Sequence, residues 1–316
     1  SRDGRWEVCA EHDPDAPDAL ARIEQDLHRG VDSVRMVGCA PMKDVEAVLE
    51  LLDLSETGVV WEQGSSVSER LDAILRAGER QGVARERLWG SIGTDPFAAH
   101  LADGAATPTD AVWDAMAQAV VKRPPHLATV AFTGMAAREA GGSAVTELGA
   151  LLASVAATLR ALGSRGLSVP EVAAAARISV GLGRDQLVGI ALLRAVRLTT
   201  ARLCAAFGAP EAARTRMALH GVQLRCWQTR HDPWVNLLRS TLACFVGAAG
   251  GADAITLLPY DAPGGMPSSL GLRMATNTQL LLTEESHLGV VSDPAAGSFT
   301  VEQLTVFIHH GNTVTI

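Results

Sequence analysis

The chain has 316 residues, enough for two average domains or one large barrel. With 47% hydrophobic and 20% charged residues, the composition is typical of a well-packed globular protein and excludes a disordered chain or a fibrous repeat. The formal net charge is −8 and no basic cluster offsets it, so nucleic acid is not an expected partner.

Neither a membrane span nor a secretory signal is predicted. The longest candidate apolar stretch, 148–159, has only twelve residues, too few to cross a bilayer. The first residues, SRDGRWEVCAEHD, lack the apolar run of a signal peptide. The five cysteines are odd in number and scattered, which favours a reducing cytoplasm.

Short segments rich in β-branched residues alternate with longer amphipathic segments along the chain. Strands are predicted at 33–37, 58–62, 88–93, 127–134, 178–182, 217–225, 252–260 and 287–293. Helices are predicted at 16–29, 45–54, 67–81, 110–121, 143–164, 186–207, 234–249 and 272–285. The last segment, 306–316, is expected to be too short for a full closing helix plus any further element.

Eight alternating units predict an α/β protein with a (β/α)8 TIM barrel, as a single domain over 1–316. An open sheet is the alternative if 178–182 or 287–293 is not a strand. Active sites of such barrels lie at the carboxyl ends of the strands. The candidate residues are therefore those that follow the predicted strands: Cys39, Lys43, Glu62, Gln63, Thr94, Asp95, Arg138, Glu139, Arg225 to Asp232, Tyr260, Asp261 and Asp293.

The densest polar cluster is 225–234, with the sequence RCWQTRHDPW. Cys226 and His231 are its candidate catalytic residues, a thiol and a base. The competing interpretation makes Cys226 a buried, unreactive thiol, and we favour it because free cysteines are usually buried. In that interpretation Asp232 caps the next helix, with a proline at its first position, and Trp234 packs in the core.

A second polar pair, Arg138 and Glu139, follows the strand predicted at 127–134. It would either bind an anionic group of a substrate or form an ion pair within the loop. Metal motifs such as CxxC, HExxH and HxH are absent from the sequence, as are the P-loop and GxGxxG patterns. Metal and nucleotide sites of those kinds are therefore not expected.

Five segments together resemble one known family. They are, in chain order, AREAGGSAVTELG (137–149), LLRAVRL (192–198), HDPWVNLLRST (231–241), GGADAITLLPYDA (250–262) and ATNTQLLLTEESHLGVVSDPAAGSFTVEQLT (275–305). In this order they resemble the methylmalonyl-CoA mutase family, and most of all its small (beta) subunit. The resemblance covers nearly the whole of this chain. It extends to the barrel domain of the family only.

The resemblance implies a (β/α)8 barrel threaded by an acyl-CoA, with adenosylcobalamin carried by a separate domain. Catalytic subunits have a histidine in a THxQT motif, and Cys226 takes its place here. The DxHxxG cobalamin signature is absent from the chain, so adenosylcobalamin is expected only through a partner subunit. The site residues implied are Arg160, Gln228, Thr229, Arg138 and Asn277 for substrate, and Glu285 for the cofactor.

These features lead to one main hypothesis and two alternatives. The main hypothesis is a small-subunit-like, non-catalytic partner of a cobalamin-dependent mutase subunit, in a heterodimer, with a homodimer as the alternative assembly. The first alternative is a stand-alone enzyme with different, cobalamin-independent chemistry in the same barrel. The second is a protein that binds an acyl thioester without reacting with it. A plugged barrel centre would favour the main hypothesis, and an open pocket with converging titratable groups the stand-alone enzyme.

Overall fold

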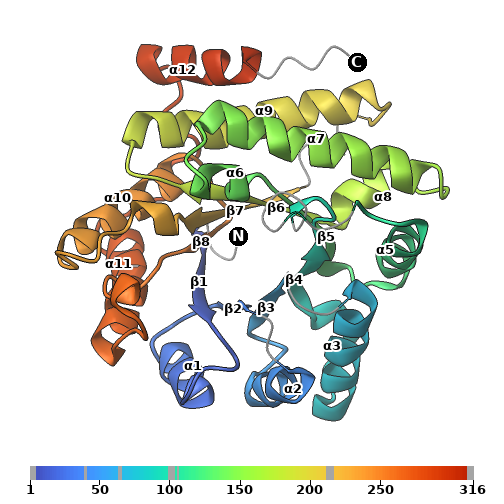
Figure 1. Ribbon diagram of the computed structural model, residues 1–316, viewed down its shortest axis with the longest axis horizontal. Coiled ribbons are helices and arrows are strands. Elements are labelled where there is room, and N and C mark those ends of the chain that lie inside the picture. The colour runs from blue at the N-terminus through green and yellow to red at the C-terminus, as the bar shows by residue number, and fades with distance from the viewer. Residues whose placement is uncertain are drawn as a thin grey trace.

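The computed structural model describes residues 5–38, 41–62, 66–98, 104, 107–210 and 217–311. They form a closed barrel of eight parallel strands surrounded by helices (Figure 1), which confirms the predicted (β/α)8 fold. The strands follow one another around the barrel in chain order. They are β1 (Glu7–His12), β2 (Ser33–Met36), β3 (Gly58–Trp61), β4 (Trp89–Thr94), β5 (His126–Thr133), β6 (Ala176–Leu182), β7 (Ala218–Gln223) and β8 (Ala254–Thr256).

The predicted strand at 287–293 is wrong, and β1 takes its place in the count of eight. β1 pairs with β2 on one side and with β8 on the other, so it closes the barrel. Residues 287–293 form turns and bends, and the apolar pair that suggested a strand, Val290 and Val291, is exposed. β1 is hard to recognise because its sequence, EVCAEH, holds a single β-branched residue between charged ones.

Each helix predicted from the sequence lies close to its predicted position. Ser66 and Glu69 form a capping box at the start of α3, and Ser143 and Ser268 cap α7 and α11 with their side chains. The barrel helices are α1 (Ala19–His28), α2 (Met42–Leu51), α3 (Val67–Gln81), α5 (Asp110–Lys122), α6 (Met135–Glu139), α7 (Ala144–Gly163), α8 (Val169–Ala174), α9 (Gln186–Ala206), α10 (Val235–Ala249) and α11 (Ser269–Glu284), with short 3-10 turns η2 (Arg85–Arg87), η4 (Arg225–Trp227) and η5 (Ala262–Gly264).

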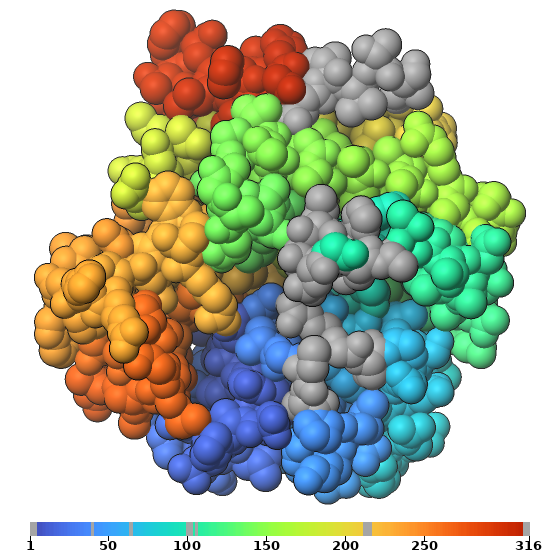
Figure 2. Space-filling model, viewed as in Figure 1, coloured from blue at the N-terminus to red at the C-terminus, as the bar shows by residue number. Residues whose placement is uncertain are grey.

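A further helix, α12 (Phe299–His310), was not predicted from the sequence, and the last segment contributes only its final residues, 306–310. It packs against α9 and α7, and Figure 2 shows it in red at one edge of the molecule, beyond those two helices. Val301, Thr305, Ile308 and His309 form its buried stripe at helical spacing. Exposed aromatic residues on its other side obscure this pattern in the sequence.

α7 is long and apolar enough to cross a membrane by length and composition alone. More than half of its apolar window is buried inside the protein, where it packs against β5, α6 and α9. Its inner face includes Leu148, Leu151, Leu152 and Val155, all inaccessible to solvent. We therefore interpret α7 as a core helix of the barrel.

Candidate functional site

Two loops at the carboxyl end of the barrel are joined by the carboxylate of Glu139. Glu139 ends the short helix α6, which follows β5. Its Oε1 accepts a hydrogen bond from the backbone N–H of Arg225 (2.7 Å), and its Oε2 accepts one from that of Cys226 (2.8 Å). Arg225 and Cys226 belong to η4, which follows β7. The two sequence-predicted polar clusters are thus brought into contact, with Glu139 in a clamping role.

Cys226 is exposed, which corrects the expectation of a buried thiol. Its Sγ lies 3.7 Å from the carbonyl oxygen of Arg138, to which the S–H donates a weak hydrogen bond. Partial desolvation, together with the nearby Glu139 carboxylate, raises the pKa of Cys226 to about 11. His231 is also exposed, and no contact between its ring and Cys226 is found among the described residues. The side chain is therefore a thiol at neutral pH rather than the reactive thiolate.

Arg138 and Glu147 form a buried ion pair with a long distance between nitrogen and oxygen, and the backbone of Arg138 contacts Cys226. Their side chains are 7% and 1% exposed, and Nη1 of Arg138 lies 3.5 Å from Oε2 of Glu147. The other oxygen of Glu147 accepts the backbone N–H of Gly181 (2.6 Å). Burial raises the pKa of Glu147 to about 7, against the lowering effects of Gly181 and Arg138. Sequence analysis predicted Arg138 but missed Glu147, which appears in the sequence only as a helix residue.

Thr229 is held by the buried amide of Asn236, and Gln228 by the backbone after β8. The Asn236 side chain accepts the N–H of Thr229 (2.9 Å) and donates to the carbonyl oxygens of Thr229 (2.8 Å) and Tyr260 (2.8 Å). Gln228 donates to the carbonyl oxygen of Pro259 (3.2 Å). Both predicted binding residues therefore lie at the rim between the ends of β7 and β8. Asn236 was missed because nothing in the sequence distinguishes it from a surface helix residue.

The expectation that Trp234 packs in the core is wrong, because 58% of its surface is exposed. Its ring stacks on that of Tyr260, with centroids 4.9 Å apart. The helix α10 begins one residue later than Trp234, so Asp232 does not cap it. Asp232 and Pro233 instead form a turn before the helix, because their carbonyl oxygens accept the N–H groups of residues 235 and 236.

The remaining predicted site residues lie away from this cluster. Arg160 is exposed, about 20 Å along α7 from Glu147 at 1.5 Å per residue, with its guanidinium over the ring of Phe207. Asn277 and Glu285 lie in the middle and at the end of α11. That end faces the start of β1, because Gln279 accepts a hydrogen bond from Trp6 (3.1 Å). Glu285 is therefore at the opposite end of the barrel from Cys226.

Several other predicted candidates have structural partners. Asp95 is buried and accepts hydrogen bonds from the side chain of Ser154 (2.7 Å) and the N–H of Thr133 (2.8 Å). Asp261 accepts one from the N–H of Ser268 at the start of α11 (3.0 Å). Cys39 and Gln63 lie outside the described residues.

The barrel lumen is crossed by buried charges. Arg177 on β6 pairs with Glu7 on β1, with 3.4 Å between Nη2 and Oε1, and Glu7 also accepts a hydrogen bond from Ser33. Two strands, β7 and β8, separate β1 from β6, so these side chains meet through the lumen. Burial alone would lower the pKa of Arg177, but Glu7, Cys9 and Glu62 raise it. The guanidinium therefore stays charged inside the barrel.

Further polar contacts fill the lumen above this pair. Glu11 pairs with Arg35 on the neighbouring strand and with Arg225 from beyond β7. Two further side-chain hydrogen bonds complete the lining, Ser91 to Glu62 (2.7 Å) and His220 to Thr256 (2.8 Å). Charged and hydrogen-bonded side chains therefore fill the described part of the lumen, where they leave no open channel.

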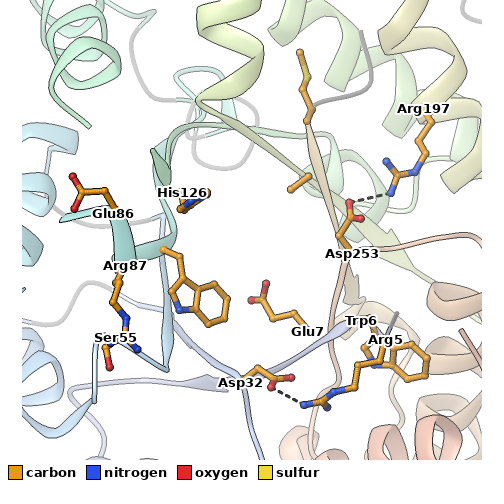
Figure 3. Close-up of a pocket in the computed structure, with 13 residues that line it drawn as sticks. Arg5, Trp6, Glu7, Asp32, Ser55, Glu86, Arg87, His126, Arg197 and Asp253 are labelled. Carbon is orange, nitrogen blue, oxygen red and sulfur yellow. Dashed lines mark hydrogen bonds and ion pairs between the residues drawn. The ribbon is translucent and has the colours of Figure 1, made fainter. Parts of the chain in front are cut away.

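A cavity of about 740 Å³ opens at the amino ends of the strands, opposite the predicted catalytic end. Its wall includes the first residues of four strands, Glu7, Trp89, His126 and Ala218. Figure 3 shows the Glu7 carboxylate pointing into the cavity and two ion pairs at its edge, Arg5 to Asp32 and Arg197 to Asp253. Because Glu7 also pairs with Arg177, the cavity ends at the ion pair that crosses the lumen.

Comparison with known proteins gives a consistent result over almost the whole chain. The family model described as methylmalonyl-CoA mutase matches residues 16–315. The chain is 36% identical over 311 residues to a methylmalonyl-CoA mutase small subunit of Streptomyces virginiae, covering 97% of this chain and 50% of that protein. It is 33% identical over 312 residues to the small subunit of Propionibacterium freudenreichii subsp. shermanii, covering 95% and 48%.

A methylmalonyl-CoA mutase of Escherichia coli is more distant, at 28% identity over 293 residues, which covers 88% of this chain and 41% of that protein. The chain therefore spans about half the length of the curated relatives it matches. The matched half contains the barrel described above.

Proposed function

Because this chain belongs to the methylmalonyl-CoA mutase family, we propose that it is a small-subunit-like barrel, a non-catalytic partner of a cobalamin-dependent acyl-CoA mutase subunit. The relatives named as small subunits support a heterodimer with a large subunit. The reaction of that partner would be the isomerisation of methylmalonyl-CoA and succinyl-CoA.

The observation that carries this proposal is the ion pair between Glu7 and Arg177 across the lumen. An acyl-CoA that threads the barrel needs a continuous passage along the axis. Removing one member of a buried ion pair typically costs about 3–5 kcal/mol, because the other charge is left without compensation. Glu7 is 18% exposed and lines the cavity, so displacing this pair costs less than displacing a fully buried one. A thioester chain would still have to part Glu7 from Arg177, and passage is not expected.

The side chain of Cys226 supports the same conclusion. It occupies the place where the resemblance expects a histidine that hydrogen-bonds the thioester carbonyl. A thiol is a weak donor, and this one already donates to the carbonyl oxygen of Arg138. With a pKa of about 11, Cys226 does not exchange protons near neutral pH. We therefore expect no proton transfer from this position.

The cofactor contact implied by the resemblance does not fit the described residues. Glu285 lies near the amino ends of the strands, away from Cys226, Gln228 and Thr229. We therefore derive no step through adenosylcobalamin on this chain, and propose that any cobalamin chemistry belongs to the partner subunit. Arg138, Gln228 and Thr229 would contact a bound acyl thioester only in the alternative in which the barrel binds one.

Two measurements test the proposal. The purified chain, supplied with adenosylcobalamin, is expected not to convert methylmalonyl-CoA into succinyl-CoA, and turnover by the chain alone would overturn the proposal. Isothermal titration with succinyl-CoA and with free coenzyme A, each with and without adenosylcobalamin, is expected to give no binding heat beyond that of the small anions malonate and phosphate. Binding of the thioester without turnover would instead favour an acyl-thioester binding protein.

A stand-alone, cobalamin-independent enzyme is the second candidate, and the pair Arg138 and Glu147 favours it. A buried acid that titrates near neutrality beside a guanidinium, at the carboxyl end of a barrel, is typical of acid–base catalysis. The variant Glu147→Gln keeps an acceptor for Gly181 but cannot titrate. Turnover found in a substrate screen and lost in this variant would support the enzyme, whereas unchanged turnover would exclude Glu147 from it.

A further inference from the structure

Three nitrogen-bearing side chains meet against Gly183, just after β6. A Cβ atom placed on Gly183 would lie 3.1 Å from Nη2 of Arg138 and 3.6 Å from Nε1 of Trp227. Arg184, the next residue, places its guanidinium carbon 4.5 Å from the centre of the Trp227 ring. These side chains come from α6, from η4 and from the loop after β6, so the fold itself brings them together.

Most N–H groups of this cluster have no acceptor in the described part of the chain. Nε and Nη1 of Arg138 and Nε1 of Trp227 are buried and make no hydrogen bond there. Arg184 is exposed and likewise has no ion pair among those residues. A buried donor without an acceptor is rare, because it keeps its full desolvation cost. The arrangement is that of a donor set whose acceptor comes from outside.

The charges around the cluster favour an anionic acceptor. Two carboxyl groups lie near Arg138, and that of Glu139 is already committed to the backbone of η4. Glu147 lies 3.5 Å from Arg138, and burial raises its pKa to about 7, so near neutrality it is charged only part of the time. The guanidinium of Arg138 is therefore incompletely neutralised.

We propose that Arg138, Arg184 and Trp227 form a binding site for a small oxyanion, next to Gly183 at the carboxyl end of the barrel. Two guanidinium groups and an indole N–H are suited to the oxygens of a carboxylate or a phosphate. The ligand reaches the site by outward movement of Trp227, which is half-buried and lies on the three-residue turn η4. This goes beyond the proposed function, since a supporting subunit needs no ligand of its own.

The site does not depend on the lumen. Arg138 and Trp227 lie beyond the carboxyl ends of the strands, whereas the blocking pair joins the first residue of β1 to the second residue of β6. A small anion can therefore bind without passing Glu7. A barrel closed to a long acyl-CoA would still be open to a short, charged molecule.

Tryptophan fluorescence of the full chain provides the binding assay. Sodium phosphate and sodium malonate are titrated separately at constant ionic strength, with sodium chloride as the balancing salt. A saturable change in emission with one of them is expected, and its identity distinguishes a phosphate from a carboxylate ligand. The chain has six tryptophans, so the same titration of Trp227→Phe, in which the change should disappear, assigns the signal.

Two variants and one control give the decisive comparison. Gly183→Ala adds a methyl group 3.1 Å from Nη2 of Arg138, which must shift that guanidinium, and keeps the net charge, whereas Arg184→Gln removes an exposed charge. Each is expected to weaken binding about tenfold, the equivalent of one charge-assisted hydrogen bond. Arg80→Gln, the same charge change on exposed α3, should bind within about twofold of the parent chain.

The proposal is overturned if chloride alone reproduces the change, if no anion gives a saturable change, or if Gly183→Ala and Arg184→Gln both bind as tightly as Arg80→Gln. Should Gly183→Ala fail to fold, Arg184→Gln still decides the question, because its side chain is exposed and supports no described contact other than that with Trp227.

Discussion

His309 on α12 accepts a hydrogen bond from Arg202 on α9 through Nε2. The hydroxyl of Thr199 donates to the carbonyl oxygen of Ala195 (2.6 Å), so it accepts from Nδ1 of His309 (3.1 Å). The proton of the neutral ring is therefore on Nδ1. Burial lowers the pKa of His309, and the positive charge of Arg202 and the neighbouring His310 lower it further.

We expect acidification to loosen α12 before the barrel unfolds. A histidine whose pKa is lowered by folding contributes its full stability above the ordinary value of 6.5, and this contribution is lost as the pH falls through the lowered pKa. Protonated His309 would face Arg202 as a like charge. Hydrogen exchange of the α12 amides, measured at pH 7.5 and at pH 5.5 with the intrinsic exchange rate corrected, should show reduced protection at the lower pH.

The matched variants are His309→Gln and His310→Gln. The first can still donate and accept hydrogen bonds but does not titrate, so the pH dependence of α12 protection should disappear. The second removes an exposed ring and should keep it. Identical pH profiles for both variants would contradict this account of the helix.

Replacing Asn236 by alanine should destabilise the carboxyl rim of the barrel. The change removes three hydrogen bonds and leaves the N–H and carbonyl groups of Thr229 and the carbonyl of Tyr260 without their partner. We expect a loss of about 2–4 kcal/mol in the free energy of unfolding, measured by urea denaturation. Asn277→Ala, at a half-buried helix position with no described hydrogen bond, should cost less than about 1 kcal/mol.

The variant Glu139→Gln should make Cys226 more reactive. After desolvation, the Glu139 carboxylate is the next cause of the raised pKa of Cys226. Removing its charge should lower that pKa and increase the rate of alkylation by iodoacetamide at pH 8 about threefold or more. Peptide mass spectrometry follows Cys226 separately from the other cysteines. Glu285→Gln, at the far end of the barrel, is the control, and an equal increase there would refute the assignment.

Arg177→Met should destabilise the protein by about 1–3 kcal/mol, because it leaves the half-buried carboxylate of Glu7 without its cation. Adding Glu7→Gln to this variant should restore a large part of the loss, since the uncompensated charge is then gone. Chemical denaturation of the parent, both single variants and the double variant gives the coupling energy of the pair. Additive effects would mean that the two side chains do not interact.

The sequence predicts this fold well because strand and helix periodicity is local. The bounds of α3, α7 and α9 agree with prediction within one residue, and the positions of Arg138, Glu139 and Cys226 at the carboxyl end follow from the strand ends. The partners of these residues are not local. Glu7 and Arg177 are 170 positions apart, and Cys226 and Glu139 are 87 apart, so no spacing rule indicates either contact.

The segments that were misassigned lack a distinguishing local pattern. β1 carries charges that point into the lumen, where a barrel strand would normally have apolar residues. Residues 287–293 have an apolar pair without a neighbouring strand to receive it. In both cases the tertiary environment decides the structure against the local propensity.

The ion pair between Glu7 and Arg177 stands between the two ends of the barrel. The cavity of about 740 Å³ lies at the amino ends of the strands, and the rim around Trp227 lies at their carboxyl ends. A molecule that enters at one end would have to part Glu7 from Arg177 to reach the other end. Each end is thus free to change its chemistry in evolution without disturbing the other, although both are built on the same eight strands.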